Sequence, residues 1–134
     1  MTKVDWVAVF AAVNLLLLVL LTFQVVGARR KHKVVLGDGG NAEVLQAMRT
    51  HGNAAETMPL ALFGLGLLAF IDPIPLVSVI GLGAAFTLSR LLHAVGLSGS
   101  AGPSFGRVSG TVLSVFSMIG IAAALLYGGL SPLL

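Results

Sequence analysis

The sequence lacks cysteine altogether and is poor in charged residues, which occupy only 10% of its 134 positions. The absence of cysteine excludes disulfide bridges and thiolate metal ligands, so any thiol chemistry needs a thiol that the substrate brings. About a quarter of the residues of a soluble domain are charged, because its surface faces water. Here 57% of the residues are hydrophobic and the mean hydropathy is +1.01. The surface itself must therefore be apolar, and the sequence predicts an integral membrane protein.

The apolar residues form continuous runs, such as the one over residues 15–21, rather than the alternating pattern of membrane β-strands. A membrane-spanning helix needs about 20 residues, so four helices with short loops use nearly the whole chain. We therefore predict an all-α membrane protein, a bundle of four transmembrane helices in which residues 1–134 form one domain and the lipid bilayer is the solvent. The first, third and fourth expected helices cover residues 4–27, 76–96 and 107–129. The second is capped by Asp38 or Asn41, begins polar and ends near residue 71.

Positive charge is distributed unevenly over the predicted loops. Seven of the eight lysines and arginines fall on one side of the bundle, and only Lys3 falls on the other. The positive-inside rule then places both termini outside and the basic loops in the cytoplasm, which in a bacterium means a multi-pass inner-membrane protein with periplasmic termini. The basic residues are thus interpreted as topology signals, and we expect no nucleic-acid partner. The seven positions are 29, 30, 31, 33, 49, 90 and 107.

Three polar residues of different chemical type line one stripe of the second predicted helix. Arg49, Asn53 and Glu56 follow the spacing i, i+4, i+7, which places them within a wedge of about 60°. A carboxylate at membrane depth costs several kcal/mol unless it is paired, and Arg49, Arg90 or Arg107 could pair with Glu56. This pattern is consistent with a ligand site and equally with a structural network of ion pairs and amides between helices.

Arg90 and His93 lie three residues apart near the end of the third predicted helix. From position alone, Arg90 is expected to snorkel toward the headgroups. A single histidine such as His93 more often makes a helix contact than it binds a ligand, and neither His32 nor His51 has metal-ligand spacing to it. We therefore predict no metal site.

Arg107 opens the fourth predicted helix, where its guanidinium and the helix N-terminus together could hold an anion. A topology signal explains the same position, and position alone favours it. Gly106, Gly110 and Ser114 are spaced by four residues, which predicts a ridge of small side chains for close helix packing.

Together these residues resemble the MAPEG family, the membrane-associated proteins of eicosanoid and glutathione metabolism. The resemblance rests on the motif Arg49-x-x-x-Asn53-x-x-Glu56-x-x-Pro59, preceded by Gly37-Asp-Gly-Gly40. Arg90-x-x-His93, Arg107 and the four-helix loop pattern extend it over nearly the whole chain. It implies a homotrimer of four-helix subunits with glutathione bound between neighbouring subunits, toward the cytoplasmic side.

The resemblance also implies roles for individual residues. Arg107 aligns with the arginine that stabilises the glutathione thiolate, which makes it the expected catalytic residue of a glutathione transferase or peroxidase. The lipophilic electrophile would arrive from the membrane. Arg49, Asn53 and Glu56 would hold the glutathione backbone and its charged ends, and an arginine of the first helix would meet a carboxylate. The expected glutathione-binding residues are Arg29, Arg30, Arg49, Asn53, Glu56, Arg90 and His93.

Three positions depart from catalytic members of that family. Gly52 stands where some members have arginine, and Thr57 and Leu97 stand where some have tyrosine. These departures favour an alternative function, a non-catalytic binding or structural membrane protein that kept the fold. A second alternative is a small multidrug-type transporter with Glu56 as its membrane-buried acid.

Overall fold

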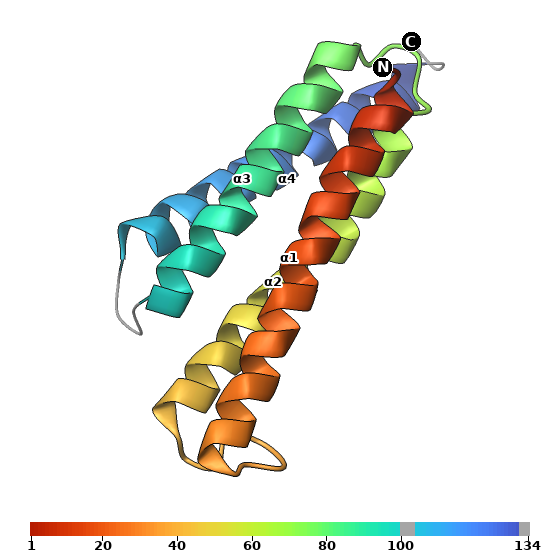
Figure 1. Cartoon of the computed structure of the whole chain (residues 1–134). Coiled ribbons are helices and arrows are strands. Elements are labelled where there is room, and N and C mark those ends of the chain that lie inside the picture. Colours follow the sequence, from red (N-terminus) through yellow and green to blue (C-terminus); the bar gives the residue numbers. More distant parts are fainter. Residues whose placement is uncertain (100–103, 132–134) are drawn as a thin grey trace.

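The structure, a computed structural model, describes residues 1–99 and 104–131 and consists of four α-helices joined by turns (Figure 1). Within these residues there is no β-strand. The predicted all-α fold class with four helices is therefore confirmed. The helices are α1 (Lys3–His32), α2 (Ala42–Leu68), α3 (Leu76–Gly99) and α4 (Phe105–Leu130).

Helix α1 is longer than predicted and continues through the basic segment that follows the apolar run. It begins with a capping box, in which Asp5 N donates to Thr2 Oγ1 at 3.2 Å and Thr2 N donates to Asp5 Oδ2 at 2.7 Å. It ends at Lys33, whose backbone is left-handed with φ 57°. The predicted end near residue 27 was wrong because cationic side chains stabilise the negative end of the helix dipole instead of ending the helix.

The turn between α1 and α2 is held by polar contacts. Asn41, not Asp38, is the N-cap of α2, and its Oδ1 accepts from two backbone N–H groups of the first turn at 3.0 and 3.2 Å. Glu43 in that first turn, on the hydrophilic end of the hairpin, pairs with Lys31 at 2.8 Å and with His32 at 2.7 Å. Hydrogen bonds from Lys31 and then His32 hold the pKa of the Glu43 carboxyl below its usual range.

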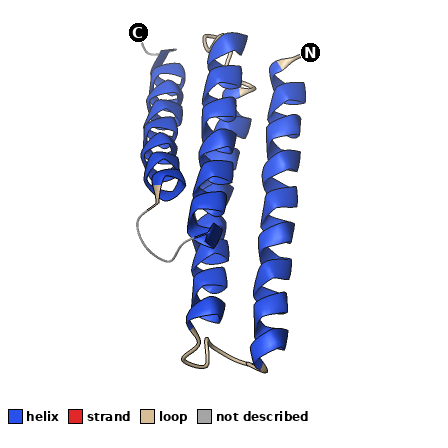
Figure 2. Cartoon of the chain, turned by 60° about the vertical axis from the view of Figure 1, so that its left-hand side comes forward, coloured by secondary structure: helices blue, strands red, loops and turns tan. Residues whose placement is uncertain are grey.

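The helices alternate in direction, so the N-terminus, the end of α4 and the α2–α3 turn lie at one end of the bundle (Figures 1 and 2). The α1–α2 hairpin lies at the opposite end and extends beyond the end of α3 and the start of α4. Helix α1 packs on α2 and α3, and α4 packs on the same two helices. Helices α2 and α3 thus form the centre of the chain.

Three of the helices, α1, α3 and α4, are long and apolar enough to cross a membrane. Helix α2 has 27 residues, but its first half is polar and only its second half is continuously apolar. Large apolar side chains are exposed on the outer face of the bundle, for example Leu15 at 63% and Phe23 at 67%. The chain is therefore an integral membrane protein with lipid around it. Its orientation and its assembly as a homotrimer stay predictions.

Apolar side chains from all four helices fill the interior at the end of the bundle that carries the termini. One cluster there contains Phe10, Leu65, Val79 and Ile121, which are all at most 7% exposed. The opposite half of the interior contains buried polar groups as well as apolar ones. The polar half is where the predicted site residues lie.

The predicted small-residue ridge of α4 is confirmed, because it brings α3 and α4 into backbone contact. A Cβ added at Gly110 would lie 2.6 Å from His93 N and 2.8 Å from His93 Cα. A Cβ added at Gly106 would lie 2.9 Å from the carbonyl oxygen of Leu92. Ser114, the third member, is buried at 4% exposure.

We expect Gly110→Ala to destabilise the protein by about 1–3 kcal/mol, because the added methyl group overpacks a contact between two backbones. Gly81→Ala in α3 is the matched control, since a Cβ there meets nothing within 4 Å. Unfolding in detergent measures both variants, and the control should be neutral or slightly more stable because alanine favours the helix. Equal stability of the two variants would contradict this packing.

Candidate functional site

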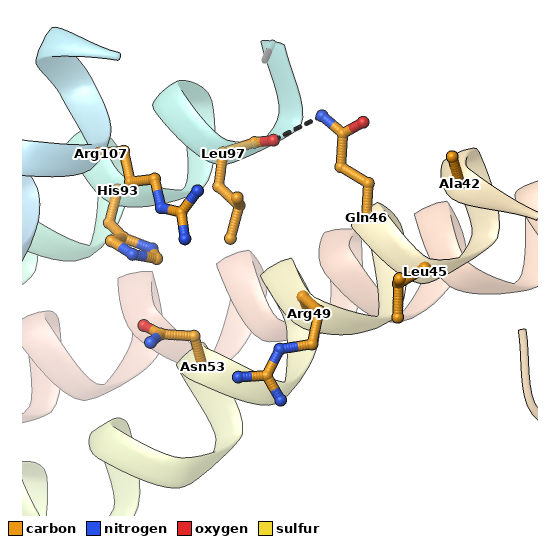
Figure 3. A pocket seen from close by; sticks show the side chains of 8 residues that line it. All are labelled: Ala42, Leu45, Gln46, Arg49, Asn53, His93, Leu97 and Arg107. Atoms are coloured by element: carbon orange, nitrogen blue, oxygen red, sulfur yellow. Dashed lines mark hydrogen bonds between the residues drawn. The ribbon is translucent and has the colours of Figure 1, made fainter. Parts of the chain in front are cut away.

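A cavity of about 250 Å³ opens between the first half of α2, the last turns of α3 and the first turn of α4 (Figure 3). Its walls are formed by five polar and three apolar side chains. The polar ones are Gln46, Arg49, Asn53, His93 and Arg107, and the apolar ones are Ala42, Leu45 and Leu97.

The cavity is electrostatically one-sided. Of its eight lining residues, two are arginines and one is a histidine, and none is an aspartate or glutamate. Guanidinium groups donate hydrogen bonds and accept none, so this lining suits an anion, above all a carboxylate or a sulfur anion. In the described part of the chain, no three His, Asp or Glu side chains lie close enough to hold a metal ion.

The α2 wall of the cavity follows from helical spacing. Gln46, Arg49 and Asn53 lie at i, i+3 and i+7 and therefore share one face. The Nε2 of Gln46 donates to the carbonyl oxygens of Leu97 at 2.7 Å and Ser98 at 3.2 Å, which ties α2 to the last turn of α3. Gln46 is not among the predicted site residues, although its spacing to Arg49 and Asn53 places it on the same helix face.

That tie also explains why α3 is longer than predicted. Residues 97–99 were expected to lie in a loop, but Leu97 and the two residues after it are helical. The carbonyl groups of Leu97 and Ser98 accept from Gln46, and Leu97 is buried at 7% exposure in the cavity wall. The rest of the predicted Gly/Ser-rich loop lies partly outside the described residues.

The other two walls depend on the close approach of α3 and α4. His93 is 5% exposed, and its backbone and Cβ lie against Gly110. Ser104 is the N-cap of α4 and its Oγ accepts from the backbone N–H of Arg107 at 3.3 Å. Arg107 therefore projects from the first helical turn, where orphan backbone N–H groups add partial positive charge.

Arg90 is buried at 3% exposure, so the expected snorkelling toward headgroups was wrong. Its Nη1 donates to Asn53 Oδ1 at 3.1 Å and to Thr57 Oγ1 at 2.6 Å. Both acceptors are neutral, and among the described residues the Arg90 Nε has no partner. Arg90 does not line the cavity but lies behind Asn53.

The orientation of the Thr57 hydroxyl allows it to accept a hydrogen bond from the Arg90 guanidinium. Its own hydroxyl hydrogen is directed at the backbone carbonyl of Asn53, one turn earlier, at 2.8 Å. The hydroxyl lone pairs are thereby left for Arg90. The threonine that stands in place of a tyrosine is thus part of an internal network that joins α2 and α3.

Glu56 does not line the cavity. Its side chain is exposed on the outer face, and within residues 1–99 and 104–131 it forms no ion pair, so the expected pairing with Arg49, Arg90 or Arg107 does not occur there. On a helix with about 100° per residue, Glu56 is rotated about 20° from Arg49 on the side opposite Asn53. Glu56 is thus close to Arg49 around the helix, but the cavity covers only part of the predicted 60° wedge.

Arg29 and Arg30, the predicted contacts from α1, also lie outside the cavity of a single chain. Arg29 Nη2 lies 3.6 Å from Met48 Sδ, between α1 and α2, and Arg30 is exposed. The structure therefore brings Arg49, Asn53, His93 and Arg107 together. It places Arg90 behind them and the remaining three predicted residues elsewhere.

Comparison with known proteins agrees with this architecture. The model of the MAPEG family matches residues 7–127. Two relatives, both called inner membrane protein YecN, come from Escherichia coli strains K12 and O6:H1. Each is 44% identical over 55 residues, which is 41% of this chain and 42% of the relative. The matched segment thus spans about two fifths of either relative, and the shared name gives a location rather than a reaction.

Replacement of Thr57 tests the buried network. We expect Thr57→Val to destabilise the protein by about 1.5–3 kcal/mol, because a buried guanidinium loses one of its two acceptors. Thr57→Ser retains the hydroxyl and should stay close to the wild type. Thr22→Val is a second control, since the exposed Thr22 hydroxyl bonds only its own helix at Leu18 O. Chemical unfolding in detergent is the measurement, and equal losses for Val at both positions would refute the network.

Proposed function

The chain belongs to the MAPEG family, and on that premise we propose that it binds glutathione in the cavity between α2, α3 and α4. We propose further that it is a glutathione transferase or peroxidase for lipophilic electrophiles. The observation that carries the proposal is the lining of the cavity, which contains Arg49 and Arg107 but no carboxylate.

The residues present fit the ligand. Glutathione is an anionic tripeptide with two carboxylates, and charge-assisted hydrogen bonds from guanidinium groups to carboxylates are the strongest that such a cavity could offer. Arg49 and the Asn53 amide are suited to these carboxylates and to the peptide backbone. His93 lies deeper in the wall, buried against α4.

A single chain offers only part of the site. The cavity holds about 250 Å³, whereas small-molecule pockets range upward from roughly 300 Å³. Arg49 is exposed at the rim, and Glu56, Arg29 and Arg30 lie outside. A homotrimer, which the family resemblance implies, would allow a neighbouring subunit to complete the wall and to bring such residues to glutathione.

Arg107 is the proposed catalytic residue. Glutathione supplies the nucleophilic thiol, whose free pKa is about 8.5 like that of other thiols, so little of it is ionised at neutral pH. The Arg107 guanidinium would donate hydrogen bonds to the sulfur anion, while the N-terminus of α4 adds positive potential. Each unit by which the thiol pKa falls needs only about 1.4 kcal/mol of preferential thiolate stabilisation. The thiolate would then attack the electrophile or reduce a peroxide.

We place the site at the cytoplasmic side of a bacterial inner membrane, with both termini in the periplasm. Seven of the eight lysines and arginines fall on the side of the bundle that carries the cavity. The positive-inside rule assigns such a basic side to the cytoplasm. The name of the Escherichia coli relatives supports the choice of membrane. An electrophile dissolved in the bilayer would reach Arg107 from the lipid-facing side of α4.

A second candidate function is glutathione binding without turnover. Thr57 directs its hydroxyl at Asn53 and accepts from Arg90, and Leu97 adds an apolar surface to the cavity. Neither residue offers the cavity a tyrosine-like hydroxyl. The transporter alternative gains no support, because Glu56 lies on the outer face and not inside the bundle.

Titration of the purified protein with glutathione, followed by the ultraviolet absorbance of the thiolate, tests the mechanism. We expect the wild type to generate thiolate at neutral pH and Arg107→Ala to lose it, because the other arginine of the cavity, Arg49, is assigned to the carboxylates of glutathione. Lys33→Gln removes an exposed cation outside the cavity and should leave the signal unchanged. If the wild type gives no thiolate at saturating glutathione, the mechanism is wrong. Binding with thiolate but no turnover of a generic electrophile would support the second candidate.

A further inference from the structure

Arg90 contributes to the cavity without lining it. Its guanidinium is buried between α2 and α3, and its Nη1 reaches the Asn53 amide through Oδ1 at 3.1 Å. Asn53 in turn lines the cavity (Figure 3). Among the described residues, the hydrogen bond that joins Arg90 to a side chain of the cavity wall is therefore the one to Asn53.

The bond from Arg90 decides which end of the Asn53 amide is available. A side-chain amide carries an acceptor oxygen and a donor NH₂ group on the same carbon, and either can face a ligand if the amide can rotate. Here the oxygen is held by a donor that has no acceptor function at all. Among the described residues no hydrogen bond uses the Asn53 Nδ2. The NH₂ group is therefore the end of the amide that stays available to a ligand.

The geometry points to Arg90 as a positioning residue: it fixes the Asn53 amide with its NH₂ group toward the cavity, so that this wall selects an anionic group. In naming glutathione as the anion, the inference rests on the proposed function. The positioning itself does not depend on the identity of the ligand. Thr57 assists, because its Oγ1 accepts from the same Nη1 at 2.6 Å and so restricts the movement of the guanidinium away from Asn53.

The choice of an amide at position 53 follows from the same argument. A carboxylate there would satisfy the buried guanidinium better, since a charged acceptor strengthens the hydrogen bond. It would also place a negative charge on the wall that faces the ligand and remove the only donor of that side chain. Asparagine satisfies Arg90 through one atom and presents a donor through the other, which aspartate cannot do.

A double-mutant cycle separates positioning from mere support of the fold. Glutathione affinity is measured by calorimetry in detergent for the wild type, Arg90→Met, Asn53→Ala and the double variant. We expect Arg90→Met to weaken binding about tenfold, the loss expected for a hydrogen bond to a charged group. In the Asn53→Ala background the same change should have almost no effect. A tenfold loss in both backgrounds would show that Arg90 only supports the fold and would overturn the inference.

The Asn53→Asp variant tests the amide donor while Arg90 stays in place. We expect this variant to unfold at or above the wild-type temperature, because Arg90 gains a charged partner. Glutathione affinity should fall at least tenfold, because at least one charge-assisted hydrogen bond is lost. Retained affinity would overturn the inference, since the amide donor would then be unnecessary. This arm decides the matter even if Arg90→Met does not fold.

A measurement without ligand distinguishes failure of the inference from failure of the proposed function. The chain has three asparagines, Asn14, Asn41 and Asn53, so ¹⁵N-asparagine labelling gives three side-chain amide signals, and Asn53→Asp identifies its own. We expect the Asn53 NH₂ to be rigid by heteronuclear NOE in the wild type and mobile in Thr57→Val or Arg90→Met, with Asn14 and Asn41 unchanged. A mobile Asn53 in the wild type overturns the positioning. A rigid Asn53 without glutathione binding upholds it and rejects the proposed ligand.

Discussion

The buried guanidinium of Arg90 imposes the constraint on which the polar half of the bundle depends. A cation in an apolar interior is costly unless its donors are satisfied within the protein. Arg90 Nη1 finds its acceptors on the neighbouring helix, at Asn53 and Thr57. The register of α3 against α2 is therefore fixed by these contacts, and the cavity side chains on the same turns take their positions from that register.

The close contact of α3 and α4 completes this arrangement from the other side. Gly110 allows α4 to touch the backbone of α3 at His93. Because of that contact, the first turn of α4 lies beside the last turns of α3, and Arg107 faces the same cavity as Asn53 and Arg49. Close packing of small residues and a buried cation thus act together. The small residues set the distance between α3 and α4, and the buried cation sets which polar atoms of α2 face inward.

The sequence was informative where a single helix determines the outcome. Apolar runs and composition predict the four helices, and the spacing of Gly106, Gly110 and Ser114 predicts the α3–α4 contact, because each pattern depends only on helical periodicity. It was less informative where partners on other helices decide. The burial of Arg90 depends on acceptors 33 and 37 residues away, and the extension of α3 depends on Gln46. Periodicity cannot reveal either contact.

The polar stripe on α2 also shows what helical periodicity can and cannot predict. At about 100° per residue, Thr57, Gln46, Asn53, Arg49 and Glu56 follow one another around the helix from the interior to the outside. Periodicity orders them correctly, but only the positions of α3 and α4 decide where the interior ends. Thr57 thus joins the buried network, Asn53 and Gln46 form the wall, Arg49 marks the rim and Glu56 faces outward. Among the described residues neither Arg49 nor Glu56 forms an ion pair. Charged residues at membrane depth are costly unless they are paired, so the exposed edge of this stripe is the part that a single chain leaves unsatisfied.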